Sequence, residues 1–240
     1  MLTAFTNHKT VTVKDQQAAT GEKGFAALAT AGVLSQLSAV LIVLAGIYPI
    51  PRIARVGILV LVLTWAAEYL GVKTGIPFGR YQYTPLLQPQ FGGVPLLVPL
   101  AWLMMLPPAW AIVSRIVSPR KRLFFAAASG LAFTAWDLFL DPQMVANGLW
   151  AWDQPGQYFG IPLSNFLGWW LVSTLITLLI NPLEMNDTAA RLLAVIYTLT
   201  WLLQAAGLAI FWNLPLPALC GLIGMGAFTL FFWQKEMRLL

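Results

Sequence analysis

The stretch that decides the fold is residues 123–140, LFFAAASGLAFTAWDLFL, in which every residue except one aspartate is apolar or small. A run of this length and composition approaches the roughly 20 residues that a helix needs to cross a bilayer. Asp137 lies near the end of the run, and Asp141 follows it four residues later. An ionisable group inside a membrane segment is costly, so these two acids mark a candidate functional site.

The composition of the whole chain also indicates a membrane protein. Apolar residues make up 59% of the 240 residues and charged residues only 10%, whereas a soluble domain carries about 25% charged residues. The mean hydropathy is +0.74. The net charge of +5 does not indicate nucleic-acid binding, because Lys and Arg fall in short loops between apolar runs. A single cysteine, Cys220, excludes both an intrachain disulfide and a multi-cysteine zinc site.

The apolar runs predict an all-α fold, a polytopic membrane bundle of about seven transmembrane helices. We expect residues 1–24 to form a polar N-terminal tail and residues 25–240 to form a single transmembrane helical domain. The pair Pro107-Pro108 should kink or break the third helix, because proline removes a backbone donor. The predicted spans are residues 25–48, 53–70, 95–114, 123–140, 166–180, 191–211 and 214–233.

The distribution of basic residues predicts the orientation of the bundle. Basic residues gather in cytoplasmic loops of membrane proteins, so the richer side should face the cytoplasm. We therefore predict that the N-terminus lies outside and the C-terminus in the cytoplasm, in the cell membrane. The predicted cytoplasmic side carries Arg52, Arg55, Arg115, Arg120, Lys121, Arg122, Arg191, Lys235 and Arg238, and the opposite side carries Lys73, Arg80 and, in the tail, Lys9, Lys14 and Lys23.

The acids fall near the outer ends of two predicted helices. Residues four apart on a helix share a face and stand about 6 Å apart along the axis, so Asp137 and Asp141 belong to one polar stripe with Gly130 and Thr134. Glu68 occupies a similar position near the end of the second predicted span. The site is therefore expected near the outer face.

Structural roles for the acids remain open from the sequence. Asp141 would serve equally well as an interfacial cap or turn residue ahead of Pro142. Asp137 and Glu68 would be accommodated structurally by pairing with Arg80 or with a tyrosine hydroxyl.

Tryptophan is abundant and has two predicted locations. Interfacial belts are the usual position of this residue in membrane proteins, and at least half of these side chains are expected there. Rings close to the acids would form a wall suited to a cation or to a flat polyene. We assign Trp102, Trp110, Trp212 and Trp233 to the interface and note that Trp136, Trp150, Trp152, Trp169 and Trp170 crowd the segment that holds the acids.

The absence of certain residues narrows the chemistry. No histidine lies in a predicted span, because the only one, His8, is in the tail. Histidine-held iron, haem and copper sites are therefore disfavoured, and we expect no metal. The seventh span has no lysine at its centre, which excludes a retinal Schiff base. The expected chemistry uses carboxyl groups, hydroxyl groups and water.

A series of motifs follows Glu68 along the chain: FGRYQY (78–83), PLLVPLAW (95–102), WDLFLDP (136–142), GLWAWD (148–153) and YFGIPLSNFLGWW (158–170). Together they resemble the CruF-type membrane carotenoid 1′,2′-hydratases, the bisanhydrobacterioruberin hydratase family. The resemblance runs from about Trp65 to Trp170, nearly half of the chain.

The resemblance implies a cofactor-independent hydro-lyase of carotenoid biosynthesis. Such an enzyme adds water across the terminal C1′,2′ double bond of an acyclic (psi) carotenoid end. Its expected partners are an acyclic or monocyclic carotenoid such as lycopene or gamma-carotene, water, the lipid bilayer and other carotenoid enzymes. No nucleic acid and no cofactor are implied.

The chemistry of alkene hydration suggests roles for the acids. A protonated acid must deliver a proton to C2′, and water must then capture the tertiary cation at C1′. Burial in a low-dielectric site favours the protonated form of the acid. We predict Asp137 as the acid, with Glu68 or Asp141 holding the water, although donor and acceptor could be exchanged. The candidate substrate-binding residues are Arg80, Tyr81, Tyr83, Trp136, Trp150, Trp152, Asp153, Tyr158 and Asn165.

Three other functions remain open. A membrane prenyltransferase would use the Asp-x-x-x-Asp spacing to hold magnesium on a diphosphate, but Phe133 stands where that family has asparagine. A proton-initiated carotenoid cyclase would share the first cation, and Pro182-Leu183-Glu184 faintly resembles the Pro-x-Glu motif of membrane cyclases. The third alternative is a carotenoid-binding membrane protein without enzymatic activity.

Overall fold

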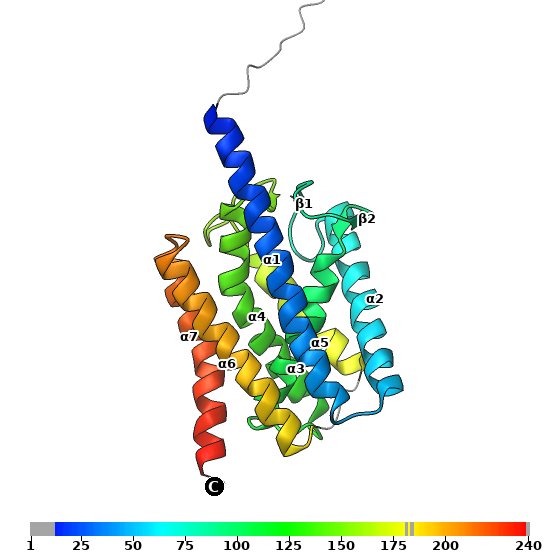
Figure 1. The fold of residues 1–240 in the computed structure, drawn as a ribbon. Coiled ribbons are helices and arrows are strands. Elements are labelled where there is room, and N and C mark those ends of the chain that lie inside the picture. Colours follow the sequence, from blue (N-terminus) through cyan, green and yellow to red (C-terminus); the bar gives the residue numbers. More distant parts are fainter. Residues whose placement is uncertain (1–12, 181, 183–184, 239–240) are drawn as a thin grey trace, which may run out of the picture.

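The computed structural model describes residues 13–180, 182 and 185–238. Within these residues the chain forms seven α-helices, each with a segment long and apolar enough to cross a membrane. The predicted all-α membrane bundle is confirmed (Figure 1). The helices are α1 (Val13–Ala45), α2 (Ile50–Thr74), α3 (Leu97–Ser114), α4 (Arg122–Ala146), α5 (Leu163–Ile180), α6 (Asp187–Ile210) and α7 (Pro215–Met237).

The structure covers only part of the expected tail. Helix α1 begins at Val13, inside the stretch assigned to the tail, and residues 1–12, with His8, lie outside the described residues. Leu183 and Glu184 of the cyclase-like motif also lie outside them. The first residue of α1 and the last of α7 are at opposite ends of the bundle (Figure 1). Which end faces the cytoplasm remains a prediction.

Helix α3 forms the centre of the bundle. It packs against α1, α2, α4, α6 and α7, and every residue from Trp102 to Val113 is buried. A helix that is apolar on all sides belongs in such a position. Of the kink or break predicted at Pro107-Pro108, the break is wrong, because α3 remains helical through both prolines, and the kink stays a prediction. Packing on all sides explains why prolines are tolerated within a membrane helix.

Two tryptophans of α3 that the sequence analysis predicts at the membrane interface lie inside the bundle instead. Trp102 and Trp110 are both 0% exposed. The Nε1 of Trp110 donates to the Oγ1 of Thr177 at 2.9 Å, which links α3 to α5. Their helix is central, so these two rings cannot reach the lipid headgroups.

Helices α2 and α4 are longer than the hydropathy pattern predicts. Helix α2 continues to Thr74 and ends where Gly75 adopts a left-handed φ of +81°. Helix α4 continues through Pro142 to Ala146, so Asp141 is not a cap or turn residue at the helix end. Its side chain is 2% exposed. Asp141 therefore lies inside the bundle with Asp137.

The segments that follow α2 and α4 pair with each other at one end of the bundle. Strand β1 (Tyr81–Tyr83) runs antiparallel to β4 (Trp150–Trp152), with Tyr81 opposite Trp152 and Tyr83 opposite Trp150. Strand β2 (Gln90–Phe91) pairs with β3 (Val94–Pro95). Side chains two apart on a strand share a face, so both tyrosines of β1 point the same way.

A cluster of charged residues lies near the C-terminal end of α7. The Glu236 carboxylate of α7 accepts from Arg115 Nε at 2.5 Å and from Arg191 Nε at 2.6 Å. Arg115 also contacts Asp187 at 2.7 Å. These pairs join the end of α3 to α6 and α7.

Candidate active site

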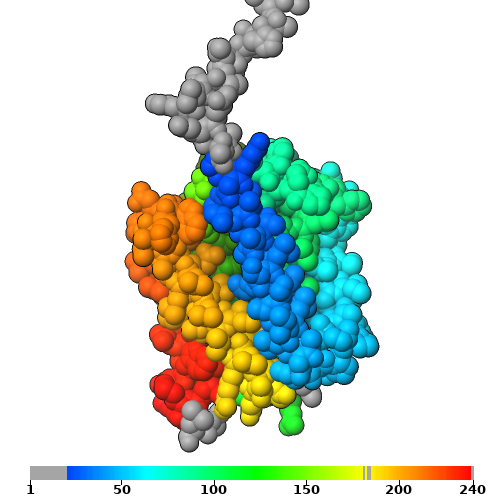
Figure 2. Space-filling model, in the orientation of Figure 1, coloured from blue at the N-terminus to red at the C-terminus, as the bar shows by residue number. Residues whose placement is uncertain are grey.

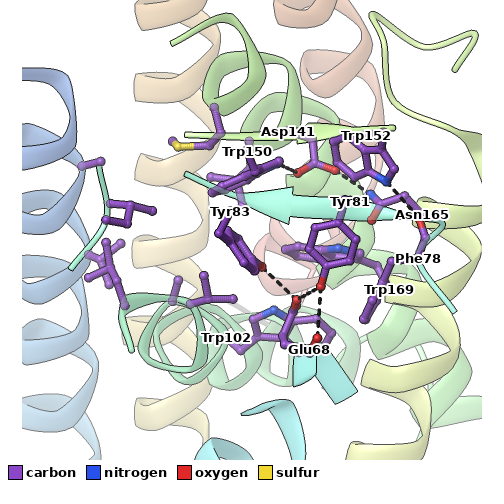
Figure 3. A pocket seen from close by; sticks show the side chains of 18 residues that line it. Glu68, Phe78, Tyr81, Tyr83, Trp102, Asp141, Trp150, Trp152, Asn165 and Trp169 are labelled. Atoms are coloured by element: carbon purple, nitrogen blue, oxygen red, sulfur yellow. Dashed lines mark hydrogen bonds between the residues drawn. The ribbon is translucent and has the colours of Figure 1, made fainter. Parts of the chain in front are cut away.

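Glu68 is the first acid of the candidate site and is held by strand β1. Its Oε2 accepts hydrogen bonds from the hydroxyls of Tyr81 at 2.5 Å and Tyr83 at 2.8 Å (Figure 3). Burial raises the pKa of both tyrosine hydroxyls, and the neighbouring Glu68 charge raises it further. Both tyrosines therefore stay protonated and act as donors. Glu68 pairs with tyrosine hydroxyls, as one structural alternative predicted, and not with Arg80.

Glycine allows Tyr81 to reach this position. A Cβ placed on Gly71 would lie 2.7 Å from the Phe78 ring and 3.0 Å from the Tyr81 hydroxyl. Gly71 is one turn beyond Glu68 on α2. Any larger residue there would displace the donor from Glu68.

Asp137 and Asp141 form the second part of the site and share one donor. Asn165 of α5 donates through Nδ2 to Asp137 Oδ2 at 2.9 Å and to Asp141 Oδ2 at 2.5 Å. Trp150 Nε1 donates to Asp141 Oδ1 at 3.1 Å. Among the described residues no hydrogen-bond partner reaches Asp137 Oδ1, although Asp137 is 0% exposed. One amide group thus holds two buried carboxyl groups together.

The close approach of α4 and α5 brings Asn165 to the acids. A Cβ on Gly130 of α4 would lie 2.4 Å from Thr174 Oγ1 and 2.9 Å from the Trp170 carbonyl oxygen. Only glycine fits this contact. Since Gly130 lies on the same face as Asp137, the contact sets the distance between that face and α5.

Glu68 and Asp141 border a cavity of about 60 Å³. A water molecule needs roughly 10–15 Å³ of such space, so the cavity has room for several waters or for the narrow end of an apolar molecule. Glu68, Tyr81, Tyr83, Asp141 and Asn165 supply its polar wall (Figure 3). The other lining residues are Ala29, Val33, Phe78, Leu87, Leu97, Val98, Ala101, Trp102, Leu140, Met144, Trp150, Trp152 and Trp169.

Aromatic rings from α3, α4 and α5 pack beside the acids. The ring centroids of Trp102 and Trp169 are 4.8 Å apart, and Phe133 lies 4.7 Å from Trp102 and 5.2 Å from Trp169. Trp136 packs edge-on against Trp169 at 6.0 Å and lines a different cavity. Ring faces attract cations, so the Trp102 and Trp169 rings suit a positively charged intermediate.

The remaining predicted site residues lie away from this cavity. Arg80 and Asp153 line a surface pocket of about 200 Å³ next to Tyr81, and Gln82 Nε2 donates to Asp153 Oδ1 at 3.3 Å. Tyr158 donates its hydroxyl to the Leu138 carbonyl at 2.9 Å and does not line the acid cavity. Asp137 lies behind the cavity wall rather than on it.

Several cavity residues carried no functional signal in the sequence. Ala29 and Val33 of α1 are ordinary apolar residues of a membrane span, and only the fold brings them to the acids. Trp102 ends the PLLVPLAW motif, although tryptophan composition alone predicts it at the interface. Phe78 begins the FGRYQY motif, so that motif was the one signal that could have found it.

These features define a polytopic membrane protein with a buried, aromatic-walled site that carries carboxyl groups. The chain belongs to the family described as "Carotenoid biosynthesis protein", which it matches over residues 28–228. It is also 33% identical over 146 residues to a bisanhydrobacterioruberin hydratase from Haloarcula japonica. That match covers 57% of this chain and 48% of the relative, so the chain spans about half the length of that curated protein. No solved structure matches the chain.

Proposed function

We propose that the protein is a carotenoid hydratase, a cofactor-independent hydro-lyase that adds water across the C1′,2′ double bond of an acyclic carotenoid end. The observation that carries the proposal is the Asp137–Asn165–Asp141 arrangement beside a cavity walled by aromatic rings. Membership of the carotenoid biosynthesis family and the similarity to a named hydratase support it. We place the reaction in the cell membrane, with lycopene or gamma-carotene as the first substrates to test.

The two aspartates act as the proton donor in this proposal. Two carboxyl groups so close together are accommodated most readily when they share one proton, because like charges in a buried site repel strongly. Asp141 lines the cavity whereas Asp137 does not, which favours Asp141 as the group that meets the alkene. Asp137, predicted from the sequence as the donor, would then hold the shared proton one turn deeper. Transfer of that proton to C2′ leaves a tertiary cation at C1′.

Glu68 positions the water in this mechanism. Both tyrosine hydroxyls donate to Oε2, and no described donor reaches Oε1, so Oε1 is available to a water molecule. The water oxygen bonds to C1′, and one of its protons passes to a carboxylate. Return of that proton to the aspartate pair restores the donor, and the net change is the addition of one water. Trp102 and Trp169 would stabilise the cation until water captures it.

The hydrogen bonds of Asp141 weigh against the prenyltransferase alternative. Holding magnesium on a diphosphate requires open carboxylate oxygens, but both oxygens of Asp141 accept hydrogen bonds, from Trp150 and Asn165. The arrangement therefore serves better as a proton relay than as a cation ligand.

Expression in a bacterium that makes lycopene tests the proposal. We expect pigment that is heavier by one water, formed without oxygen gas, with its new oxygen drawn from isotopically labelled water. A new pigment of unchanged mass would indicate a cyclase instead. Unaltered pigment at good expression would refute hydration of this substrate, and repetition with gamma-carotene would complete the test.

A further inference from the structure

A second and larger cavity, of about 550 Å³, lies between α1, α3, α4 and α6. It is lined on α1 at positions from Phe25 to Ala39 and on α6 at positions from Ile196 to Gln204, and we name it the α1–α6 groove. The space-filling view shows where it lies, with the green surface of α4 between the blue α1 and the orange α6 (Figure 2).

The groove opens to the side of the bundle. Three leucines on its rim are strongly exposed: Leu28 at 69%, Leu199 at 51% and Leu203 at 70%. Both helices that carry them are long and apolar enough to span a membrane. A leucine-rimmed opening between two such helices faces hydrocarbon rather than water, so a molecule that enters here comes from the lipid.

The groove and the acid cavity share a wall. Ala29 and Val33 of α1 and Leu140 and Met144 of α4 line both spaces. Leu140 directly precedes Asp141 in α4. The groove therefore approaches the acids to within the thickness of a few apolar side chains.

The sizes of the two spaces suit different parts of one long molecule. The acid cavity, at about 60 Å³, has room for a reacting end but not for a whole carotenoid. The groove follows α1 from Phe25 to Ala39, which is about 21 Å at 1.5 Å per residue. This is roughly two thirds of the 30 Å hydrocarbon core of a bilayer. A slot of that length fits an extended hydrocarbon chain better than a compact one.

We infer that the α1–α6 groove binds the polyene chain of the substrate, which enters sideways from the lipid and passes its reacting end between Leu140 and Met144 to the acids. This inference rests on the proposed function. Most polar groups that line the groove are compatible with an apolar occupant, because they bond within the protein. Thr200, for example, donates to Gln36 Oε1 at 3.0 Å. Gln204 Oε1, buried without a partner among the described residues, offers a contact for a polar substituent on the chain.

Gly32 gives a direct test of occupancy. It lines the groove, and a Cβ placed there would meet nothing within 4 Å, so a larger side chain would fill the slot without disturbing its neighbours. Gly24 is the matched control, because it lies on the same helix, has the same open surroundings and does not line the groove. The same glycine-to-phenylalanine substitution can therefore be compared at the two positions.

The experiment expresses wild type, Gly32→Ala, Gly32→Leu, Gly32→Phe and Gly24→Phe in the lycopene-producing bacterium. Pigment retained per purified protein and the hydrated fraction in membranes are both measured, with thermal stability in detergent as the check on folding. We expect both readouts to fall stepwise with side-chain volume at residue 32, by about ten-fold or more for phenylalanine, a difference of one decade in affinity. Gly24→Phe should match wild type.

The outcomes separate the groove from the reaction. Equal pigment retention in Gly32→Phe and wild type would overturn the groove inference. A loss of pigment in Gly24→Phe as large as that in Gly32→Phe would also overturn it, and so would a groove filled by membrane lipid instead of pigment. Normal hydration by Gly32→Phe would overturn it while leaving the proposed reaction intact. Retained pigment in wild type with no hydrated product, together with its loss in Gly32→Phe, would support the groove and refute the reaction.

Discussion

Replacing the two bridged aspartates by asparagine, singly and together, tests whether they act as one unit. Asparagine keeps the volume of aspartate but cannot deliver a proton to an alkene. In Asp141→Asn the Trp150 bond to Oδ1 can persist, because the new amide still offers an oxygen there. Its amide nitrogen would then face the Asn165 nitrogen, so Asn165 must turn over and give up its bond to one of the two partners.

The size of the effect follows from these contacts. General acid catalysis contributes roughly 10²–10⁴-fold, and each ten-fold corresponds to about 1.36 kcal/mol. Each single variant should therefore lose about 2.7–5.4 kcal/mol of transition-state stabilisation. If the carboxyls share one proton, the double variant should be no slower than the slower single variant, since losses from groups that act together are not additive.

Initial rates of hydrated pigment in membranes, at matched protein levels and separated by chromatography, give the measurement. The fold should survive, because exchanging a buried acid for a neutral amide removes a cost of burial rather than a packing contact. Multiplicative losses in the double variant would refute a shared proton. A normal rate in Asp137→Asn would remove Asp137 from the mechanism, and Glu68 would be the next acid to test.

Three further predictions concern other parts of the chain. Tyr83→Phe removes one of the two donors to Glu68 and should slow hydration roughly 5–30-fold, from about 1–2 kcal/mol for a buried hydrogen bond; a rate equal to wild type would argue against Glu68 as the water-positioning group. Glu236→Gln weakens the pairs that join α3, α6 and α7 and should lower the free energy of unfolding by about 1–3 kcal/mol, seen in thermal denaturation, with the rate per folded molecule unchanged. Asp153→Cys, in a Cys220→Ser background, should be labelled from the non-cytoplasmic side, because its loop carries no Lys or Arg; labelling from the cytoplasm would reverse the predicted orientation.

The helices could be predicted from the sequence because each is a continuous apolar run. The sequence did not, however, predict which helix lies at the centre of the bundle. Trp102 and Trp110 resemble interfacial residues in isolation, and only packing around α3 places them at the centre. The end of α4 was predicted too early because Pro142 and Asp141 both favour a turn locally, whereas tertiary contacts keep the helix intact.

The candidate site was partly predictable for a similar reason. Spacing alone put Asp137 and Asp141 on one helix face, and their depth in a membrane segment made them candidates. Their partners come from distant segments: Asn165 lies on α5 and Trp150 on β4. Strands of three residues give no reliable periodicity, so the pairing of β1 with β4 had no signal in the sequence. The contribution of α1 to both cavities likewise depends on the assembled bundle.

The order in which the hydrogen-bond partners occur along the chain has a consequence for synthesis at the ribosome. Glu68 is followed after 13 and 15 residues by Tyr81 and Tyr83, and Asp141 after nine and 24 residues by Trp150 and Asn165. Each acid therefore emerges from the ribosome before its donors do. An unpartnered acid in lipid is unfavourable, so we expect α4 to remain in a hydrated or loosely inserted state until α5 emerges. A nascent chain arrested with Asp141 emerged and Asn165 still inside the ribosome should accordingly be extracted from membranes more easily than one arrested after Asn165 has emerged.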